Sequence, residues 1–126
     1  MKYCLSLVFT IFAFSVVQAQ QPMLDWAKSC NGLKDERVNG IAVDGFGNVY
    51  TTGSFEGTVD FNPGAATNNI TSNGEWDAFI SKLDAAGNFV WVDKIGGANW
   101  EYAFGVDVDA SGNVYIGGAF QDVVDF

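Results

Sequence analysis

Two tryptophans carry the side chains of this sequence that are best suited to recognise a ligand. Trp76 and Trp100 each lie beside an acidic residue at the end of a predicted loop. An indole ring stacks on apolar or sugar faces while its N–H donates a hydrogen bond. Trp76 and Trp100 are therefore the candidate ligand-binding residues. Trp26 and Trp91 lie 65 residues apart at equivalent places in a repeat, which favours packing between repeats.

One acidic segment resembles the start of a calcium loop. Asp107, Asp109 and Ser111 alternate ahead of a glycine, and calcium loops place oxygen ligands in this way. The bidentate Glu that such a loop needs is replaced by Gly118, and the equivalent of Asp107 one repeat earlier is Ala42. A hairpin turn is the simpler interpretation, with calcium as the alternative.

No residue pattern predicts catalysis. The sequence holds no histidine, so Ser-His and Cys-His nucleophile pairs are excluded. Asp60 and Asp125 recur in Val-Asp-Phe, and two carboxylates can hydrolyse a glycosidic bond. A residue that recurs once per repeat more often has a structural role. We expect no catalytic residue, no metal and no cofactor.

The charge balance excludes several partners. Six Lys and Arg stand against 15 Asp and Glu, giving a net charge of −9. Such a chain repels phosphate backbones and anionic lipid surfaces, so we expect no nucleic acid and no membrane insertion after leader removal. Cys4 would leave with the leader, and Cys30 alone cannot form an intrachain disulfide.

The N-terminus has the features of a signal peptide. Lys2 is followed by an apolar stretch at 5–17 and by Val-Gln-Ala ending at Ala19. The apolar stretch is short for a membrane span. We expect cleavage after residue 19 and a secreted, extracellular or cell-surface protein.

A 65-residue internal repeat organises the remaining chain. Without a gap, Gly32 matches Gly97, Gly-Asn-Val-Tyr at 47–50 matches 112–115, and Val-Asp-Phe at 59–61 matches 124–126. Self-similarity at a fixed period is the sequence signature of a repeat architecture.

Three copies of Asp-x-x-Gly-Asn predict β-hairpin turns. An Asp side chain can bond the backbone two residues on, and Gly adopts the positive φ of a tight turn. The turn residues are Asp44, Gly47, Asn48, Asp84, Gly87, Asn88, Asp109, Gly112 and Asn113. The flanking strands are predicted at 38–43 with 48–54, 77–83 with 89–95, and 103–109 with 113–120.

This pattern predicts an all-β fold made of propeller blades, each a four-stranded antiparallel sheet. Residues 38–102 form the first repeat, and 103–126 form the first half of a second in an incomplete ring. A long connection at 56–76 joins the two hairpins of the first repeat. Residues 20–37 supply a closing strand and a connection, because 23–28 align with the fourth strand at 88–93.

The sequence resembles the SBBP-type bacterial β-propeller repeat. The resemblance rests on residues 41–55, Asp-Ala-Phe-Ile-Ser-Lys-Leu-Asp at 77–84 and Gly-Asn-Phe-Val-Trp at 87–91. It implies the N-terminal part of a large exported protein of Bacteroidota-like bacteria, with further blades in the same polypeptide. The family offers no general catalytic residues.

Three functions remain open from the sequence. The first is a non-catalytic extracellular binding or scaffold module for a protein or glycan ligand. The second is part of a secreted enzyme whose active site lies in other blades or a fused domain. The third is a structural surface or adhesion protein.

Overall fold

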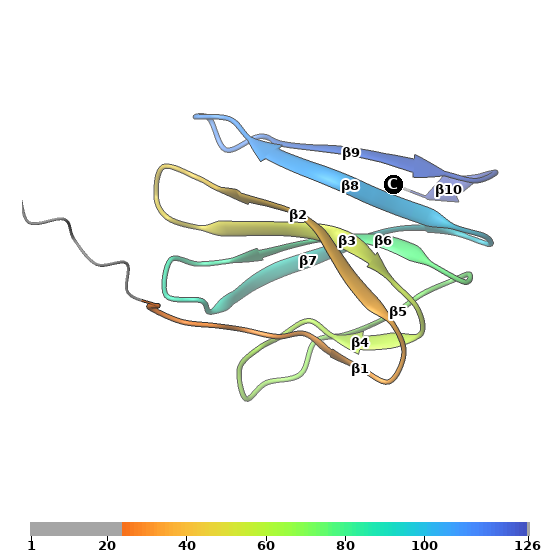
Figure 1. The fold of residues 1–126 in the computed structure, drawn as a ribbon, viewed down its shortest axis with the longest axis horizontal. Helices are drawn as coiled ribbons and strands as arrows, with labels where there is room; N and C mark the ends of the chain where they lie inside the picture. Colours follow the sequence, from red (N-terminus) through yellow and green to blue (C-terminus); the bar gives the residue numbers. More distant parts are fainter. Residues whose placement is uncertain (1–23, 126) are drawn as a thin grey trace, which may run out of the picture.

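The computed structural model describes residues 24–125, and every element in this range is a β-strand. The predicted signal peptide at 1–19 lies outside the described residues. Since none of the described residues forms a helix, none forms one that is long and apolar enough to cross a membrane. Figure 1 shows the strands stacked in layers.

The main layer is an antiparallel sheet with the order β10-β7-β6-β3-β2. Its long strands are β2 (Glu36–Val43), β3 (Val49–Phe55), β6 (Asp77–Leu83) and β7 (Phe89–Gly97). These strands lie close to the predicted positions. Alternating apolar residues mark the length of each strand, and turn residues mark its ends. The short β10 (Val124–Asp125) was not predicted and pairs with the end of β7.

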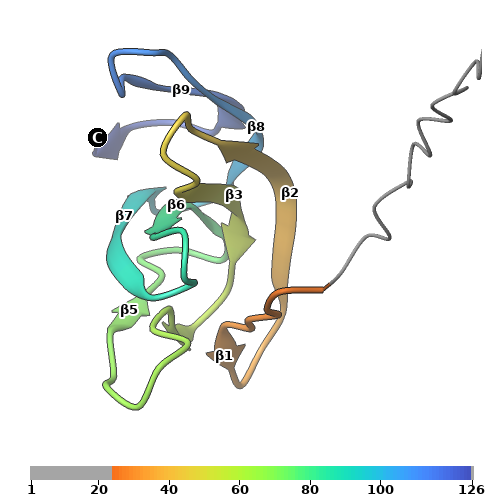
Figure 2. The same ribbon diagram turned by 90° about the vertical axis from the view of Figure 1, so that its left-hand side faces the viewer.

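A second layer is the hairpin of β8 (Glu101–Val108) and β9 (Val114–Phe120). It repeats the geometry of the β2–β3 hairpin. Each hairpin has a register shift in its first strand, between Val38 and Gly40 in β2 and between Ala103 and Gly105 in β8. The β8–β9 hairpin covers one face of the main sheet, where the Asn39 side chain donates a hydrogen bond of 2.8 Å to the carbonyl of Ala103 (Figure 2).

The main sheet therefore has two distinct faces. We call the face under β8–β9 the covered face. The opposite face, which carries Val38, Ile41 and Val43 along β2, is the open face. Successive strand residues alternate between the two faces, so β3 contributes Val49 and Thr51 to the open face.

The connection at 56–76 contains structure that was not predicted. Within it, β4 (Thr58–Asp60) pairs with β5 (Asn69–Thr71), and β1 (Asn31–Gly32) joins them in a three-stranded sheet. Each of these strands has two or three residues, too few for an alternating pattern to be recognised. The small sheet lies on the open side of the main sheet and encloses a core of Phe55, Val59, Phe61 and Phe79.

The closing strand predicted near the N-terminus stays a prediction, because the blade that it would pair with is not among the described residues. Residues 24–30 form no strand, and β1 pairs with β4 rather than with the main sheet. A strand needs a neighbouring edge to satisfy its backbone groups, and no described strand runs beside 24–30. The segment is held instead by Trp26, whose Nε1 donates to the Ala85 carbonyl at 3.2 Å in the β6–β7 turn.

The three Asp-x-x-Gly-Asn segments form the same turn. At the first, Asp44 Oδ1 accepts the backbone N–H groups of Phe46 and Asn48, both at 2.9 Å. Its Oδ2 accepts Asn48 Nδ2 at 2.7 Å and the Tyr50 hydroxyl at 3.2 Å. Gly47, Gly87 and Gly112 have φ values of 82°, 78° and 84°, the left-handed region that glycine adopts without steric cost.

Candidate ligand-binding site

The structure brings Trp76 and Trp100 together although they are 24 positions apart. Trp76 precedes β6, Trp100 precedes β8, and the two residues form an isolated parallel bridge. The Glu101 N–H donates to the Trp76 carbonyl at 2.7 Å, which ties the two strand entries to each other. The residues that precede β6 and β8 therefore lie side by side at one edge of the molecule. We call this edge, formed by Trp76 and Trp100, the tryptophan rim.

Trp100 is the accessible member of the tryptophan rim. Its side chain is 48% exposed, and its Nε1 donates a hydrogen bond to the carboxylate of Glu75. The neighbouring Asn99 Nδ2 donates to Asp122 Oδ2 at 2.7 Å. The indole is thus held in orientation while much of its surface remains open, as a stacking platform for a flat apolar or sugar face requires.

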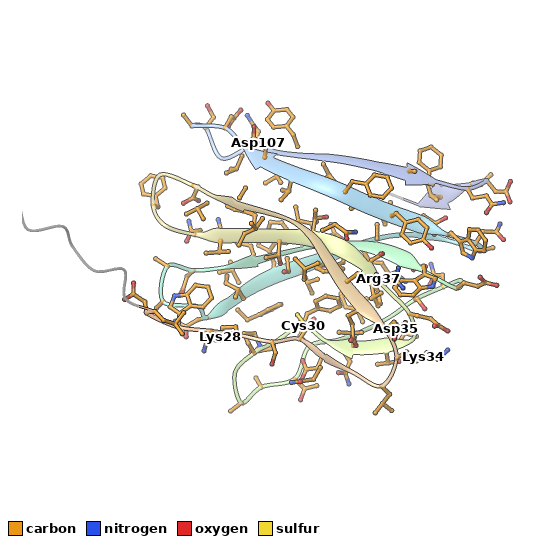
Figure 3. The ribbon with its side chains drawn as sticks, in the orientation of Figure 1. Lys28, Cys30, Lys34, Asp35, Arg37 and Asp107 are labelled. Carbon is orange, nitrogen blue, oxygen red and sulfur yellow. The ribbon has the colours of Figure 1, made fainter. Side chains whose placement is uncertain are left out.

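The Trp76 ring contacts side chains from two layers of the fold. The Arg37 guanidinium lies 4.8 Å from one Trp76 ring centroid, and the Tyr102 ring lies 6.2 Å from the Trp76 ring at an interplanar angle of 31°. Figure 3 labels Arg37 on β2. Arg37 and Tyr102 are 65 residues apart, at equivalent positions of β2 and β8. Trp76 therefore packs against both the main sheet and the β8–β9 hairpin.

The aromatic surface continues beyond Trp76. Tyr102 and Phe104 are stacked with centroids 6.4 Å apart and an interplanar angle of 6°, and Phe104 is 59% exposed. An exposed aromatic row next to carboxylates suits a ligand with an apolar face and hydrogen-bond donors.

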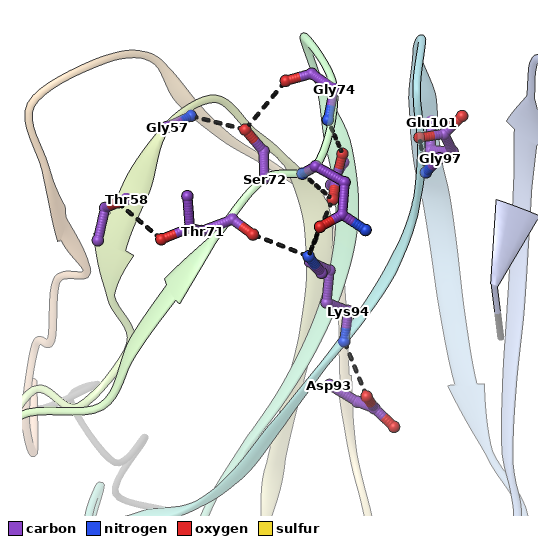
Figure 4. Close-up of polar contacts among 11 residues, drawn as sticks. Gly57, Thr58, Thr71, Ser72, Gly74, Asp93, Lys94, Gly97 and Glu101 are labelled. Carbon is purple, nitrogen blue, oxygen red and sulfur yellow. Dashed lines mark hydrogen bonds and ion pairs between the residues drawn. The ribbon is translucent and has the colours of Figure 1, made fainter.

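Two buried carboxylates beneath the rim were missed by the sequence reasoning. Asp77 is fully buried, accepts the N–H of Asn73 at 2.9 Å and lies 3.4 Å from Lys94 Nζ. Lys94 also donates to the Thr71 carbonyl and to Asn73 Oδ1, each at 2.8 Å (Figure 4). This network fixes the loop between β5 and β6 that ends at the tryptophan rim.

Glu101 is the second of these carboxylates, and only 1% of it is exposed. Its Oε2 accepts the Gly97 N–H at 2.7 Å, whereas Oε1 has no hydrogen-bond partner. Glu36 occupies the equivalent position of β2, and its Oε1 is also unpartnered. The 65-residue spacing between Glu36 and Glu101 was the sequence signal that could have found both residues.

The calcium candidates are used by the β8–β9 turn. Asp109 Oδ1 accepts the N–H groups of Ser111 at 2.8 Å and Asn113 at 2.9 Å, and Oδ2 accepts Asn113 Nδ2 at 2.7 Å and the Tyr115 hydroxyl at 3.1 Å. Asp107 Oδ1 accepts its neighbour's N–H at 2.8 Å. Among residues 24–125, no three His, Cys, Asp or Glu side chains are grouped as metal ligands.

Hydrogen bonds to the charged form lower the pKa of the three turn aspartates. For Asp44, Asp84 and Asp109, the main cause is the side-chain amide of the Asn four positions later, supported by backbone N–H groups. Their role is therefore to hold the turns as carboxylates.

A groove of about 430 Å³ lies on the open face, between β2, β3 and β6 and the N-terminal segment. Its lining includes Trp26, Cys30, Glu36, Phe61, Phe79 and Leu83. Burial raises the pKa of the Cys30 thiol, and the charges of Glu36 and Asp60 raise this pKa further. The thiol is thus a packing group of low nucleophilicity at neutral pH. Asp60 itself holds the following loop, where its Oδ1 accepts Asn62 N–H at 3.0 Å and Asn68 N–H at 2.8 Å.

Comparison with known proteins agrees with the layered β architecture. The SBBP family model, a β-propeller repeat, matches residues 34–54, which hold β2 and most of β3. An uncharacterized WD repeat-containing protein of Acanthamoeba polyphaga mimivirus is 27% identical over 111 residues. These matches support a β-propeller repeat protein. The aligned region covers 77% of this chain but only 8% of the viral protein, and no solved structure matches.

Proposed function

We propose that this chain is part of a non-catalytic β-propeller module that binds a protein or glycan ligand at the tryptophan rim. The single observation that carries the proposal is the position of Trp100. Trp100 is 48% exposed, its Nε1 donates a hydrogen bond to Glu75, and the residue forms a parallel bridge with Trp76. Propeller loops on one side of the ring commonly carry the ligand contacts.

The proposal includes the wider architecture. Each blade is a four-stranded sheet of a 65-residue repeat, and further blades of the same polypeptide complete the ring. The apolar stretch at 5–17 and the small residue at Ala19 support export to the cell surface or beyond in a bacterium. The match to 8% of a longer relative is compatible with a chain that continues into further repeats.

The test is a glycan array and a panel of surface-protein peptides, probed with the chain and with Trp100→Ala. We expect Trp100→Ala to weaken binding of any hit by about tenfold or more, because an exposed aromatic anchor contributes much of the affinity in small sites. Phe46→Ala is the matched control, since Phe46 is an 86% exposed aromatic residue in a turn remote in sequence from the rim.

Equal binding by Trp100→Ala and the parent chain would disprove the tryptophan rim as the ligand site. Hits that appear only with further domains of the reading frame, together with hydrolysis of the bound glycan, would favour an enzyme instead. Absence of any hit would favour a purely structural or adhesion role.

A further inference from the structure

The backbone around Trp100 recurs in the first repeat with different side chains. There, the Glu56 N–H donates to the Asp35 carbonyl at 3.1 Å. At the equivalent place of the second repeat, the Gln121 N–H donates to the Trp100 carbonyl at 3.2 Å. A side chain that the shared backbone requires should recur, so the side chains that differ between the two places are free to serve recognition.

The charges at the two places differ. In the first repeat, Lys34 pairs with the Glu56 carboxylate and balances its charge. Asn99 stands at the position of Lys34, and its uncharged amide donates to Asp122 Oδ2 at 2.7 Å. Glu75 lies beside it, since the Glu75 N–H donates to the Asn99 carbonyl at 3.2 Å. Within the part of the chain that the structure describes, no lysine or arginine pairs with Glu75 or Asp122.

Asp122 occupies a backbone position that favours glycine. Its φ is 64°, and the equivalent residue of the first repeat is Gly57, with a φ of 76°. Most side chains are strained in this left-handed region, which Asp adopts more readily than most. The turn therefore does not require a carboxylate, and Asp122→Gly removes the charge while supplying a residue that this turn accepts.

Trp100 adds an accessible aromatic surface to these two carboxylates. Its Nε1 donates to the Glu75 carboxylate, which holds the ring beside one of them. The face of an indole attracts a cation, and carboxylates accept strong hydrogen bonds from it. The equivalent residue Asp35 is exposed as well, although the connection at 56–76 that follows it is complete. The exposure of Trp100 is therefore compatible with further blades of the polypeptide.

We propose that the tryptophan rim binds a cationic side chain of a protein ligand, either a lysine ammonium or an arginine guanidinium. The cation lies over the Trp100 ring and donates hydrogen bonds to Glu75 and Asp122. It supplies the positive charge that Lys34 supplies in the first repeat. The net charge of −9 draws a basic segment toward the chain. This inference rests on the proposed function, because it names the ligand class of the same site.

The test compares two matched sets of short peptides. The first set contains Lys or Arg in varied neutral contexts. The second set replaces Lys by acetyl-lysine and Arg by citrulline, which remove the charge. Fluorescence anisotropy should show that the parent chain binds the best basic peptides at least about tenfold more tightly than their neutral counterparts. Raising the salt concentration from about 0.1 M to about 1 M should weaken this binding, because the charges are then screened.

Two variants remove the carboxylates one at a time. Glu75→Gln keeps an oxygen that can accept the Trp100 Nε1–H, and Asp122→Gly restores the residue type of the first repeat. Each should weaken binding of the basic peptides by about three- to tenfold, as loss of a charged partner does at an interface. Urea unfolding verifies that the variants fold, and Asp122→Asn replaces Asp122→Gly if the latter does not.

Asn99→Lys tests the role of the missing cation directly. Its ammonium can pair with Asp122, as that of Lys34 pairs with Glu56, and should therefore weaken binding of the basic peptides. Glu56→Gln is the matched control, because this carboxylate is already paired and its equivalent in the second repeat is Gln121. This control should bind the basic peptides within about twofold of the parent chain.

Failure of this inference and failure of the proposed function give different results. If Trp100→Ala loses binding to neutral peptides or glycans while Glu75→Gln and Asp122→Gly bind as the parent chain does, the rim takes a neutral ligand and the cationic ligand is disproved. If Trp100→Ala also binds as the parent chain does, both proposals fail. Equal binding of basic and neutral peptides, or no binding of the basic peptides, would overturn the cationic ligand.

Discussion

Val38 and Ala103 occupy equivalent positions of β2 and β8, yet Val38 is 62% exposed and Ala103 is 2% exposed. Both residues precede a register shift of the same kind in their hairpins. The difference arises because β8 packs on the main sheet, whereas no described strand covers Val38. Local conformation is thus the same at the two positions, and layer stacking alone determines burial.

This relationship predicts a large difference between matched substitutions. Ala103→Asp should lower the free energy of unfolding by more than about 3 kcal/mol, because an unpaired carboxylate would be buried between the two layers. Val38→Asp should change this free energy by about 0.5 kcal/mol or less, since the position is exposed. Urea unfolding measures both. Similar losses for the two variants would contradict the observed stacking.

The ion pair between fully buried Asp77 and partly exposed Lys94 gives a second prediction. Lys94→Met should lower the free energy of unfolding by roughly 2–4 kcal/mol, because fully buried Asp77 would lose its cationic partner. Lys34→Met is the control, since Lys34 and Glu56 form an exposed pair whose loss should cost less than about 1 kcal/mol. Chemical denaturation of both variants measures the effect, and equal losses would argue against the network in Figure 4.

The lowered pKa values of the three turn aspartates predict that the fold loses stability as the pH falls. Their pKa values are lowered in the folded state, so the stability they contribute is present above the unfolded pKa of about 3.9 and is lost as pH falls toward the folded pKa. Asp84→Asn should therefore be less stable than the parent chain at pH 7, and the difference should shrink at pH 3.

Thermal unfolding monitored by circular dichroism between pH 3 and pH 7 measures this effect. Asp25→Asn, at an exposed position of the N-terminal segment, is the control and should follow the parent curve. A difference between Asp84→Asn and the parent chain that does not vary with pH would show that the carboxylate charge does not hold the turn.

A substitution at Gly112 tests the backbone conformation of the β8–β9 turn separately from side-chain packing. Its φ is 84°, and apart from Gly112 and its two chain neighbours no heavy atom lies within 4 Å of where a Cβ would stand. Gly112→Ala should therefore cost about 1 kcal/mol through conformation alone. Gly45→Ala is the control, because its surroundings are equally open and its φ is not positive. Urea unfolding in which both variants behave alike would contradict this turn geometry.

The sequence alone determined the local elements of this protein. Alternating apolar residues located the long strands, and Asp44, Asp84 and Asp109 marked three turns, because hairpin turns are set by contacts within about five residues. The strands β4 and β5 escaped detection because three residues cannot show a period. Residues 24–30 form no strand in the structure, and the closing strand predicted at 23–28 stays a prediction, since a strand depends on a neighbour that sequence similarity cannot supply.

Only the tertiary structure decided which residues meet. It placed Trp76 between Arg37 and Tyr102, left Trp100 exposed beside Glu75, and buried Glu101 beneath them. These contacts join residues far apart in the chain, and they follow from how the layers stack rather than from any local preference. For the same reason the sequence could identify Val38 and Ala103 as equivalent but could not tell which of them is buried.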